Sequence, residues 1–184
     1  IEIDPNYAHA HYNLGKLLCD LRRLKDAEFY TRKAIEINPN FANAYSNLGK
    51  ILYSLGKLKD AELSYRKAIH LNPSFTDAYY NLGNLFFDLR RLKDAEFSYR
   101  KAIQLNPNLS SAYFSLSTLK LSNESKTWKK HLFSGNILNN KLKRDKIKLY
   151  FARANILHKE KKYQESSKYF KLANNLKLDI KPSK

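Results

Sequence analysis

The sequence has no methionine, one cysteine (Cys19), one tryptophan (Trp128) and only five glycines in 184 residues. A lone cysteine excludes an internal disulfide and favours a reducing compartment, so we expect a cytoplasmic protein. No apolar run approaches the roughly 18 residues that a membrane-spanning helix requires. Because the chain begins at Ile1 and lacks methionine, we expect it to be a piece of a longer protein, and its lack of a signal peptide excludes little.

The scarce residue types also argue against catalysis. The glycines, at 15, 49, 56, 83 and 135, form no phosphate-binding loop. The five histidines have no cysteine or carboxylate partners at metal-ligand spacing, and neither paired catalytic carboxylates nor a nucleophile with its base is visible. Cys19 is better explained as a small packing residue than as a nucleophile. We therefore expect no enzyme activity, no metal and no cofactor in these 184 residues.

Acidic residues are the scarce charge. The chain has 34 Lys and Arg against 17 Asp and Glu, but residues 1–107 hold 16 basic and 12 acidic side chains, net +4, whereas residues 108–184 hold 18 and 5, net +13. This excess of basic residues leaves RNA or other polyanion binding open as the alternative function. The simpler interpretation is a solvated surface, or a face that docks on a neighbouring acidic domain. The residues concerned are Lys129, Lys130, Lys141, Lys143, Arg144, Lys146, Lys148, Lys159, Lys161 and Lys162, with Tyr150, Phe151 and Tyr163 near them.

The dominant feature of the sequence is a repeat with a period of 34 residues. Residues 4–37, 38–71 and 72–105 align without a gap, and the first and third units share "DLRRLKDAEF". Each unit predicts two amphipathic helices, because apolar residues recur at three- and four-residue spacing. Asn-Pro at 38–39, 72–73 and 106–107 predicts the end of each second helix. Small residues recur where two helices must approach closely, at Gly15, Gly49, Gly83, Ala27, Ala61, Ala95, Ala34, Ala68 and Ala102.

This pattern resembles the tetratricopeptide repeat. The period, the Leu-Gly pairs at 14–15, 48–49 and 82–83, the recurring alanines and the prolines at 39, 73 and 107 all agree with that family. The resemblance implies an all-α fold, a right-handed α-α superhelix of helix-turn-helix units. It also implies that the first helices line a concave groove that binds an extended peptide or a partner segment.

On the family's geometry, the groove presents one asparagine from each regular unit, Asn13, Asn47 and Asn81. The row is similar to the asparagine ladder of the O-GlcNAc transferase superhelix, whose repeats carry the same "NLG" phrase. An amide offers a donor and an acceptor, so each rung could grip a peptide backbone. The alternative is that these side chains are solvated or bond to a neighbouring helix. The other expected groove residues are Lys16, Lys50, Asn84, Tyr12, Tyr53, Tyr80 and Phe87, followed by His9, Cys19, Asp20, Asn43, Ser46, Ser54, Asp77 and Asp88.

Lys16 and Lys50 could attract carboxylates, as lysines do in the chaperone-tail clamp of other tetratricopeptide proteins. The third unit has Asn84 at the same position, and aspartates follow nearby at 20 and 88, so a dedicated clamp is not expected. The aromatic residues of the row could form groove walls for a peptide. Packing between adjacent first helices explains them equally well.

After Pro107 the period falters. We expect a divergent fourth helical pair over 108–140, with helices at 108–123 and 124–140, and Trp128 as a core anchor rather than a ligand-stacking residue. Residues 141–184 should form a divergent fifth unit and tail that cap the array. The segment "YFARANILHKEKKYQESSKYFKLANNLK" resembles the last repeat before the catalytic domain of bacterial, especially cyanobacterial, tetratricopeptide-sulfotransferase fusions. That resemblance implies a non-catalytic arm of a larger enzyme.

Overall fold

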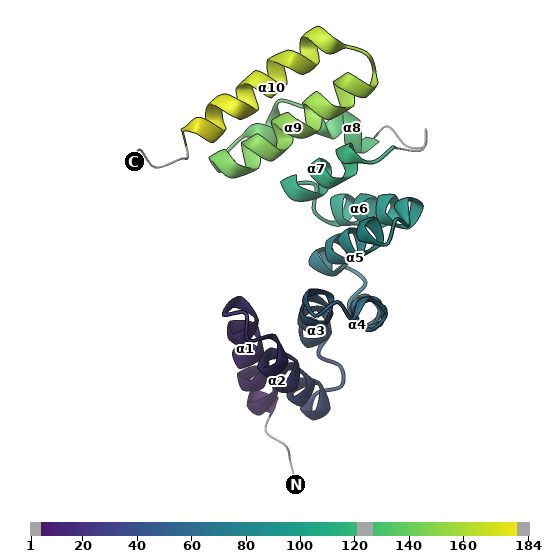
Figure 1. The fold of residues 1–184 in the computed structure, drawn as a ribbon, viewed down its shortest axis with the longest axis vertical. Coiled ribbons are helices and arrows are strands. Elements are labelled where there is room, and N and C mark those ends of the chain that lie inside the picture. The colour runs from purple at the N-terminus through teal and green to yellow at the C-terminus, as the bar shows by residue number, and fades with distance from the viewer. Residues whose placement is uncertain (1–4, 121–126, 180–184) are drawn as a thin grey trace. The chain divides into compact units, whose positions relative to one another are not determined.

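The computed structural model describes residues 5–120 and 127–179, which form ten α-helices and one short 3-10 helix (Figure 1). The expected all-α fold is confirmed, since no strand occurs in these residues. The chain divides into two compact units, Ile1–Leu89 and Arg90–Lys184, so the division falls inside the third sequence repeat rather than after Pro107.

The first unit contains two complete helix pairs and one further helix. The pairs are α1 (Pro5–Asp20) with α2 (Leu24–Ile37) and α3 (Ala42–Ser54) with α4 (Leu58–Leu71), followed by α5 (Thr76–Asp88). Two glycines permit the close approach within each pair. A Cβ at Gly15 would lie 2.4 Å from Thr31 Oγ1, and one at Gly49 would lie 2.6 Å from the Tyr65 ring. Any larger residue would therefore push the paired helices apart.

The turn inside each pair uses one residue in the left-handed region. Gly56 has φ of 75° there, and the residues one period before and after it, Arg22 and Arg90, have φ of 61° and 59°. Lys161 in the last pair has φ of 63°. At Gly56 the following amide, that of Lys57, bonds back to the Leu52 carbonyl at 2.9 Å, which satisfies a free carbonyl at the helix end.

The Asn-Pro dipeptides end the second helices, as the sequence predicts. Asn38, Asn72 and Asn106 each have extended backbone after the helix. Their side-chain oxygens accept hydrogen bonds from the backbone amides two residues later, at 3.0, 3.1 and 2.9 Å. Each asparagine thus closes a local turn that leads into the next first helix.

The second unit departs from the regular pattern. It contains α6 (Leu92–Leu105), α7 (Ser110–Thr118), α8 (Thr127–Leu132), the 3-10 helix η1 (Asn136–Leu138), α9 (Lys143–Lys159) and α10 (Tyr163–Leu178). Figure 1 shows α9 and α10 lying side by side as a long pair. The continuous helix expected over 124–140 was wrong, because among the described residues 127–140 the α-helix already ends at Leu132. Trp128 is buried in this region, which confirms its role as a core anchor.

Basic residues of α9 hold the ends of the short helices. The buried Arg153 donates from Nε to the Leu132 carbonyl at 2.9 Å and from Nη2 to the Ser134 carbonyl at 2.8 Å. Lys159 donates to the Ser117 carbonyl at 2.5 Å and also to the Leu119 carbonyl. These cations satisfy carbonyls that α7 and α8 leave unpaired, so the last pair caps the irregular helices.

Candidate functional site: the groove of the first unit

The first helices α1, α3 and α5 are neighbours within the first unit and carry the expected groove residues. The structure does not present these residues equally. Exposed side chains are His9, Asn13, Lys16, Asp20, Asn43, Lys50, Ser54, Asp77 and Asp88. Half-buried ones are Tyr12, Tyr53, Tyr80, Asn81, Asn84 and Phe87. Cys19, Ser46 and Asn47 are buried.

The three asparagines of the row differ in their surroundings. Asn13 is exposed and Asn81 is half-buried, whereas Asn47 is only 8% exposed. The Asn47 amide nitrogen donates a hydrogen bond to Thr31 Oγ1 at 3.1 Å. Its amide oxygen has no partner among residues 5–120 and 127–179. At the middle position, then, one half of the amide bonds to a neighbouring helix and the other half is left to accept.

Two polar contacts join adjacent first helices. Lys50 on α3 bonds to Asp20 on α1 at 3.3 Å, and the Tyr53 hydroxyl donates to the Asp88 carboxylate on α5. The hydrogen bond to Asp88, followed by burial, raises the pKa of Tyr53 to about 12. Lys16 is exposed, and we find no partner for it in the part of the chain that the structure describes. The groove therefore mixes both signs of charge instead of concentrating lysines.

The aromatic residues divide between packing and exposure. The Tyr12 ring lies 5.0 Å from the Phe41 ring, centroid to centroid, and packs on the cluster of Ala8, Ala34 and Ala44. This contact gives Tyr12 the packing role that the sequence left open. Tyr53, Tyr80 and Phe87 keep part of their surfaces in solvent.

Besides Asn47, two of the expected groove residues are buried. Cys19 packs against Leu18, Ala27 and Ile51, so it belongs to the core between helices. Burial also raises the pKa of the Cys19 thiol. Ser46 is buried as well. The expectation that these two side chains line the groove was wrong, since neighbouring helices cover the side of each helix on which they lie.

Sequence reasoning missed Thr31, the residue that fixes Asn47. Thr31 is fully buried on α2, and Tyr65 and Tyr99 occupy the same position of the next two repeats. A threonine at a position where the other two repeats have tyrosine was the feature of the sequence that could have pointed to it. Gly15 leaves room for the Thr31 hydroxyl, and this hydroxyl provides the acceptor that the Asn47 amide nitrogen needs.

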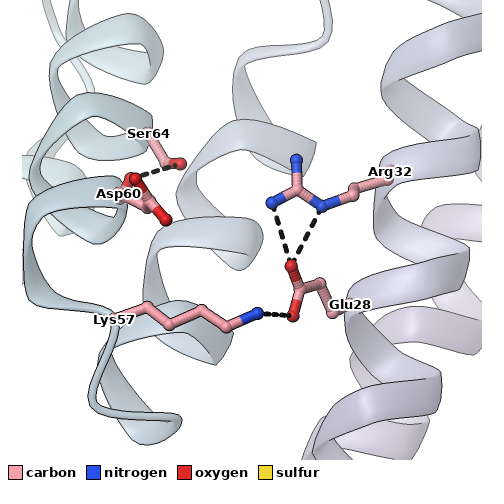
Figure 2. Close-up of polar contacts among 5 residues, drawn as sticks. All are labelled: Glu28, Arg32, Lys57, Asp60 and Ser64. Atoms are coloured by element: carbon pink, nitrogen blue, oxygen red, sulfur yellow. Dashed lines mark hydrogen bonds and ion pairs between the residues drawn. The ribbon is translucent and has the colours of Figure 1, made fainter.

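A second group that the sequence did not reveal braces α2 against the following pair (Figure 2). Glu28 accepts hydrogen bonds from Arg32 Nη2 and Nε at 2.9 and 3.0 Å, and from Lys57 Nζ at 2.8 Å. Burial raises the pKa of Glu28, but the bonds from Lys57 and Arg32 outweigh it and hold that pKa below its ordinary value. In the same view, Ser64 bonds to the Asp60 carbonyl at 2.8 Å within α4. Glu28 therefore helps to set the spacing between consecutive pairs.

Many basic residues of the second unit make internal contacts. Lys141 donates to the Asn108 carbonyl and Lys148 to Ser111 Oγ, each at 2.8 Å. Ion pairs join Lys129 to Glu160, Lys143 to Asp179 at 3.6 Å, and Lys162 to Glu160 at 3.7 Å. Lys130, Arg144 and Lys161 remain exposed, with no side-chain partner among the described residues.

No group of three or more His, Cys, Asp or Glu side chains able to hold a metal ion occurs in residues 5–120 and 127–179. Within the same residues, none of the helices combines the length and the apolar character needed to cross a membrane.

Paired helices, tight left-handed turns and small residues at the pair contacts define a helical repeat protein. Family models identify the repeat. The tetratricopeptide-repeat models match residues 8–41 and 76–109, 32–56 and 49–89, and 147–179, which together cover more than half of the chain. The chain belongs to the tetratricopeptide-repeat family.

Solved structures agree with this assignment. The chain is similar to the first tetratricopeptide-repeat domain of Spaghetti (RPAP3) bound to the HSP90 peptide SRMEEVD, with 25% identity, a TM-score of 0.61, and coverage of 64% of this chain and 94% of that one. MamA is 23% identical, with a TM-score of 0.59 and coverage of 96% of this chain and 81% of that one. The Arabidopsis OM64 tetratricopeptide-repeat domain is 22% identical, with a TM-score of 0.60 and coverage of 69% of this chain and 98% of that one. The likeness confirms the expected fold class, an α-α superhelix. No match was found among curated proteins.

Proposed function

We propose that this chain is a protein interaction scaffold whose first unit binds an extended polypeptide along α1, α3 and α5. The observation that carries the proposal is the asparagine row. Thr31 holds the Asn47 amide nitrogen, so the Asn47 oxygen is fixed as an acceptor, with Asn13 and Asn81 one period away on each side. The peptide complex of the RPAP3 domain supports a polypeptide as the ligand class.

The spacing of the row suits an extended peptide. Neighbouring helices pack roughly 8–10 Å apart, and an extended chain rises about 3.3 Å per residue, so one rung meets about every third residue. Each hydrogen bond contributes about 0.5–1.5 kcal/mol net, and three rungs therefore give modest affinity with little dependence on side chains. Tyr53, Tyr80 and Phe87 would add apolar contacts beside the rungs.

The charges in the groove favour an internal peptide segment over a terminal carboxylate. Lys50 bonds to Asp20, and Asn84 stands where the first two units have lysine. At this repeat position, Lys16 is exposed and has no acidic partner among the described residues. One cation is a weaker anchor for a carboxylate than a cluster of cations, so backbone recognition accounts better for these residues.

A displayed peptide library tests the proposal. Peptides selected on the chain are measured against wild type and against the triple variant Asn13→Ala, Asn47→Ala, Asn81→Ala. The matched control replaces three exposed asparagines of the second unit, Asn139, Asn174 and Asn175, by alanine. We expect the groove variant alone to bind the peptide at least about tenfold more weakly than wild type. Its melting temperature should fall as well, because Asn47→Ala removes the buried bond to Thr31, and circular dichroism should show that it is still folded. Equal affinity of the two triple variants for the peptide would contradict the proposal.

We further propose that the chain is the non-catalytic arm of a larger bacterial, cytoplasmic protein such as a sulfotransferase, and presents the bound segment to the linked domain. The resemblance of the closing repeat supports this context. Sequencing the mature full-length product tests it, because a sulfotransferase domain needs a phosphate-binding loop after a strand. A product that carries no such domain would contradict it.

Polyanion binding is the second candidate, supported by the net charge of +13 in residues 108–184 and by the exposed Lys130, Arg144 and Lys161. The internal contacts of Lys141, Lys148 and Lys159 count against it. Affinity for single-stranded RNA measured at rising salt decides the matter. A steep loss of affinity supports the second candidate, and the absence of binding at low salt rejects it.

A further inference from the structure

The second unit contains a cleft of about 600 Å³ that the proposed groove does not explain. Helix α6 forms one side of it, and α7 and α8 form the rest. Its lining is largely apolar and aromatic and includes no acidic residue. The lining residues that matter here are Phe97, Arg100, Lys101, Tyr113, Trp128 and His131. A cleft of this size is in the range of ligand and peptide sites.

The cleft follows from the short second helix of the fourth pair. Helices α4 and α6 have 14 residues each, whereas α8 has six, so α8 covers only part of α6. Phe97 on α6 is 60% exposed, like its equivalents in the earlier repeats, but here it lines the cleft together with the buried Trp128. The Tyr113 hydroxyl and His131 Nδ1 are hydrogen-bonded at 2.7 Å with stacked rings, which fixes the opposite wall. Because these side chains are already held in place, a ligand would not have to order them on binding, which keeps the entropy cost of binding low.

The charges around the cleft are basic. Arg100 pairs with Glu96 at 2.6 Å. Among the described residues, the Lys101 side chain bonds only to the neutral Gln104, at 3.2 Å. Lys130 on α8 does not line the cleft, but it is exposed one residue before the lining His131, and it has no partner in residues 5–120 and 127–179. Apolar walls with lysines beside them are complementary to bulky apolar side chains on an acidic segment.

We propose that this cleft binds an acidic peptide segment of a partner protein, which inserts two neighbouring bulky apolar side chains between α6 and α8. The site is a second polypeptide site, and it does not depend on the asparagine row of the first unit. The volume accommodates more than one side chain, and the lysines select acidic flanks.

Trp128 makes the proposal measurable, because it is the single tryptophan of the chain and lines the cleft. The probe is the peptide acetyl-DEFLDE-amide, which has no tryptophan, and its counterpart acetyl-KKFLKK-amide reverses the flanking charge. We expect a saturable change in Trp128 emission with the acidic peptide and binding about tenfold weaker with the basic one.

The chain offers a matched pair of variants. Phe97 and Phe29 occupy the same repeat position, two periods apart, and are 60% and 56% exposed, but only Phe97 lines the cleft. We expect Phe97→Ser to weaken the acidic probe about tenfold and Phe29→Ser to leave it unchanged. The exposed Lys130→Glu should weaken the same probe about threefold while the fold stays intact.

Each of three results with the probes would overturn the proposal, and a fourth result, with the asparagine variant, is given below. The three are no saturable emission change, equal affinity for the acidic and basic probes, and equal affinity of the two serine variants. Circular dichroism shows whether each variant is folded, and Lys130→Glu keeps the test decisive if Phe97→Ser unfolds. The triple asparagine variant should bind the probe like wild type. Loss of probe binding in that variant would place the probe in the groove and reject the second site.

Discussion

Asn47 and Thr31 form a buried hydrogen bond between two consecutive helix pairs, with the amide nitrogen 3.1 Å from Oγ1. Thr31 has no exposed surface and supplies no ligand contact of its own. In the proposed mode of peptide binding, Thr31 holds the amide nitrogen of Asn47 and leaves the amide oxygen to accept from a peptide, so we propose Thr31 as a positioning residue.

Replacing Thr31 by valine should separate this role from simple packing. Valine keeps the shape of threonine but removes the acceptor, so the Asn47 amide nitrogen is left buried and unpaired, at a cost of about 1–3 kcal/mol in the free energy of unfolding. Urea titration measures the cost, and peptide affinity should fall as well. Thr118→Val, at an exposed position, is the control. Unchanged stability and affinity would show that the bond does no positioning.

Glu28 links pH to stability. Its pKa is held below the ordinary value of 4.5 in the folded protein, so its contribution is complete above about pH 4.5 and is lost as the pH falls through the folded pKa. Glu28→Gln should lower the free energy of unfolding by about 1 kcal/mol at pH 7. The difference between variant and wild type should shrink in acid.

Denaturation of both proteins at pH 7 and below pH 4 measures this difference. Glu36→Gln serves as the control, because Glu36 is well exposed and, among the described residues, pairs only with Lys33. The link from Lys57 to Glu28 is contradicted if the two variants lose the same stability, or if the Glu28→Gln difference stays constant with pH.

The intra-pair turns offer a gain of stability. Arg22 adopts φ of 61°, a conformation that is unfavourable for residues with a Cβ and free for glycine. Arg22→Gly should therefore raise stability, and Gly56→Arg should lower it, each by about 1 kcal/mol. Thermal melting of the two reciprocal variants checks the sign. The same direction of change in both would contradict the prediction.

Part of this architecture could be predicted from the sequence. The Asn-Pro ends of the second helices follow from local chemistry, and the left-handed turns at 22 and 90 follow from their alignment with Gly56. The bond between Thr31 and Asn47 could not be predicted, because it depends on the distance between two helix pairs. The six-residue length of α8 was missed for a similar reason, since α9 supplies the caps that end it.

Arg153 provides the test of that capping. Arg153→Leu removes the donors to the Leu132 and Ser134 carbonyls, and should destabilise the second unit by about 1–3 kcal/mol. The exposed Arg144→Leu is the control for loss of charge.

Deleting residues 147–184 should have a larger effect and cause aggregation, because the irregular helices lose their cap. A truncated chain of wild-type stability would contradict the capping role.

The most direct measurement of peptide recognition in the groove combines two changes. The affinity of a library-selected peptide and of its backbone N-methylated form is measured against wild type and against the triple variant of Asn13, Asn47 and Asn81. Backbone gripping predicts that N-methylation weakens binding to wild type about tenfold and changes binding to the triple variant little. The same loss of affinity in both proteins would show that the asparagines do not hold the peptide backbone.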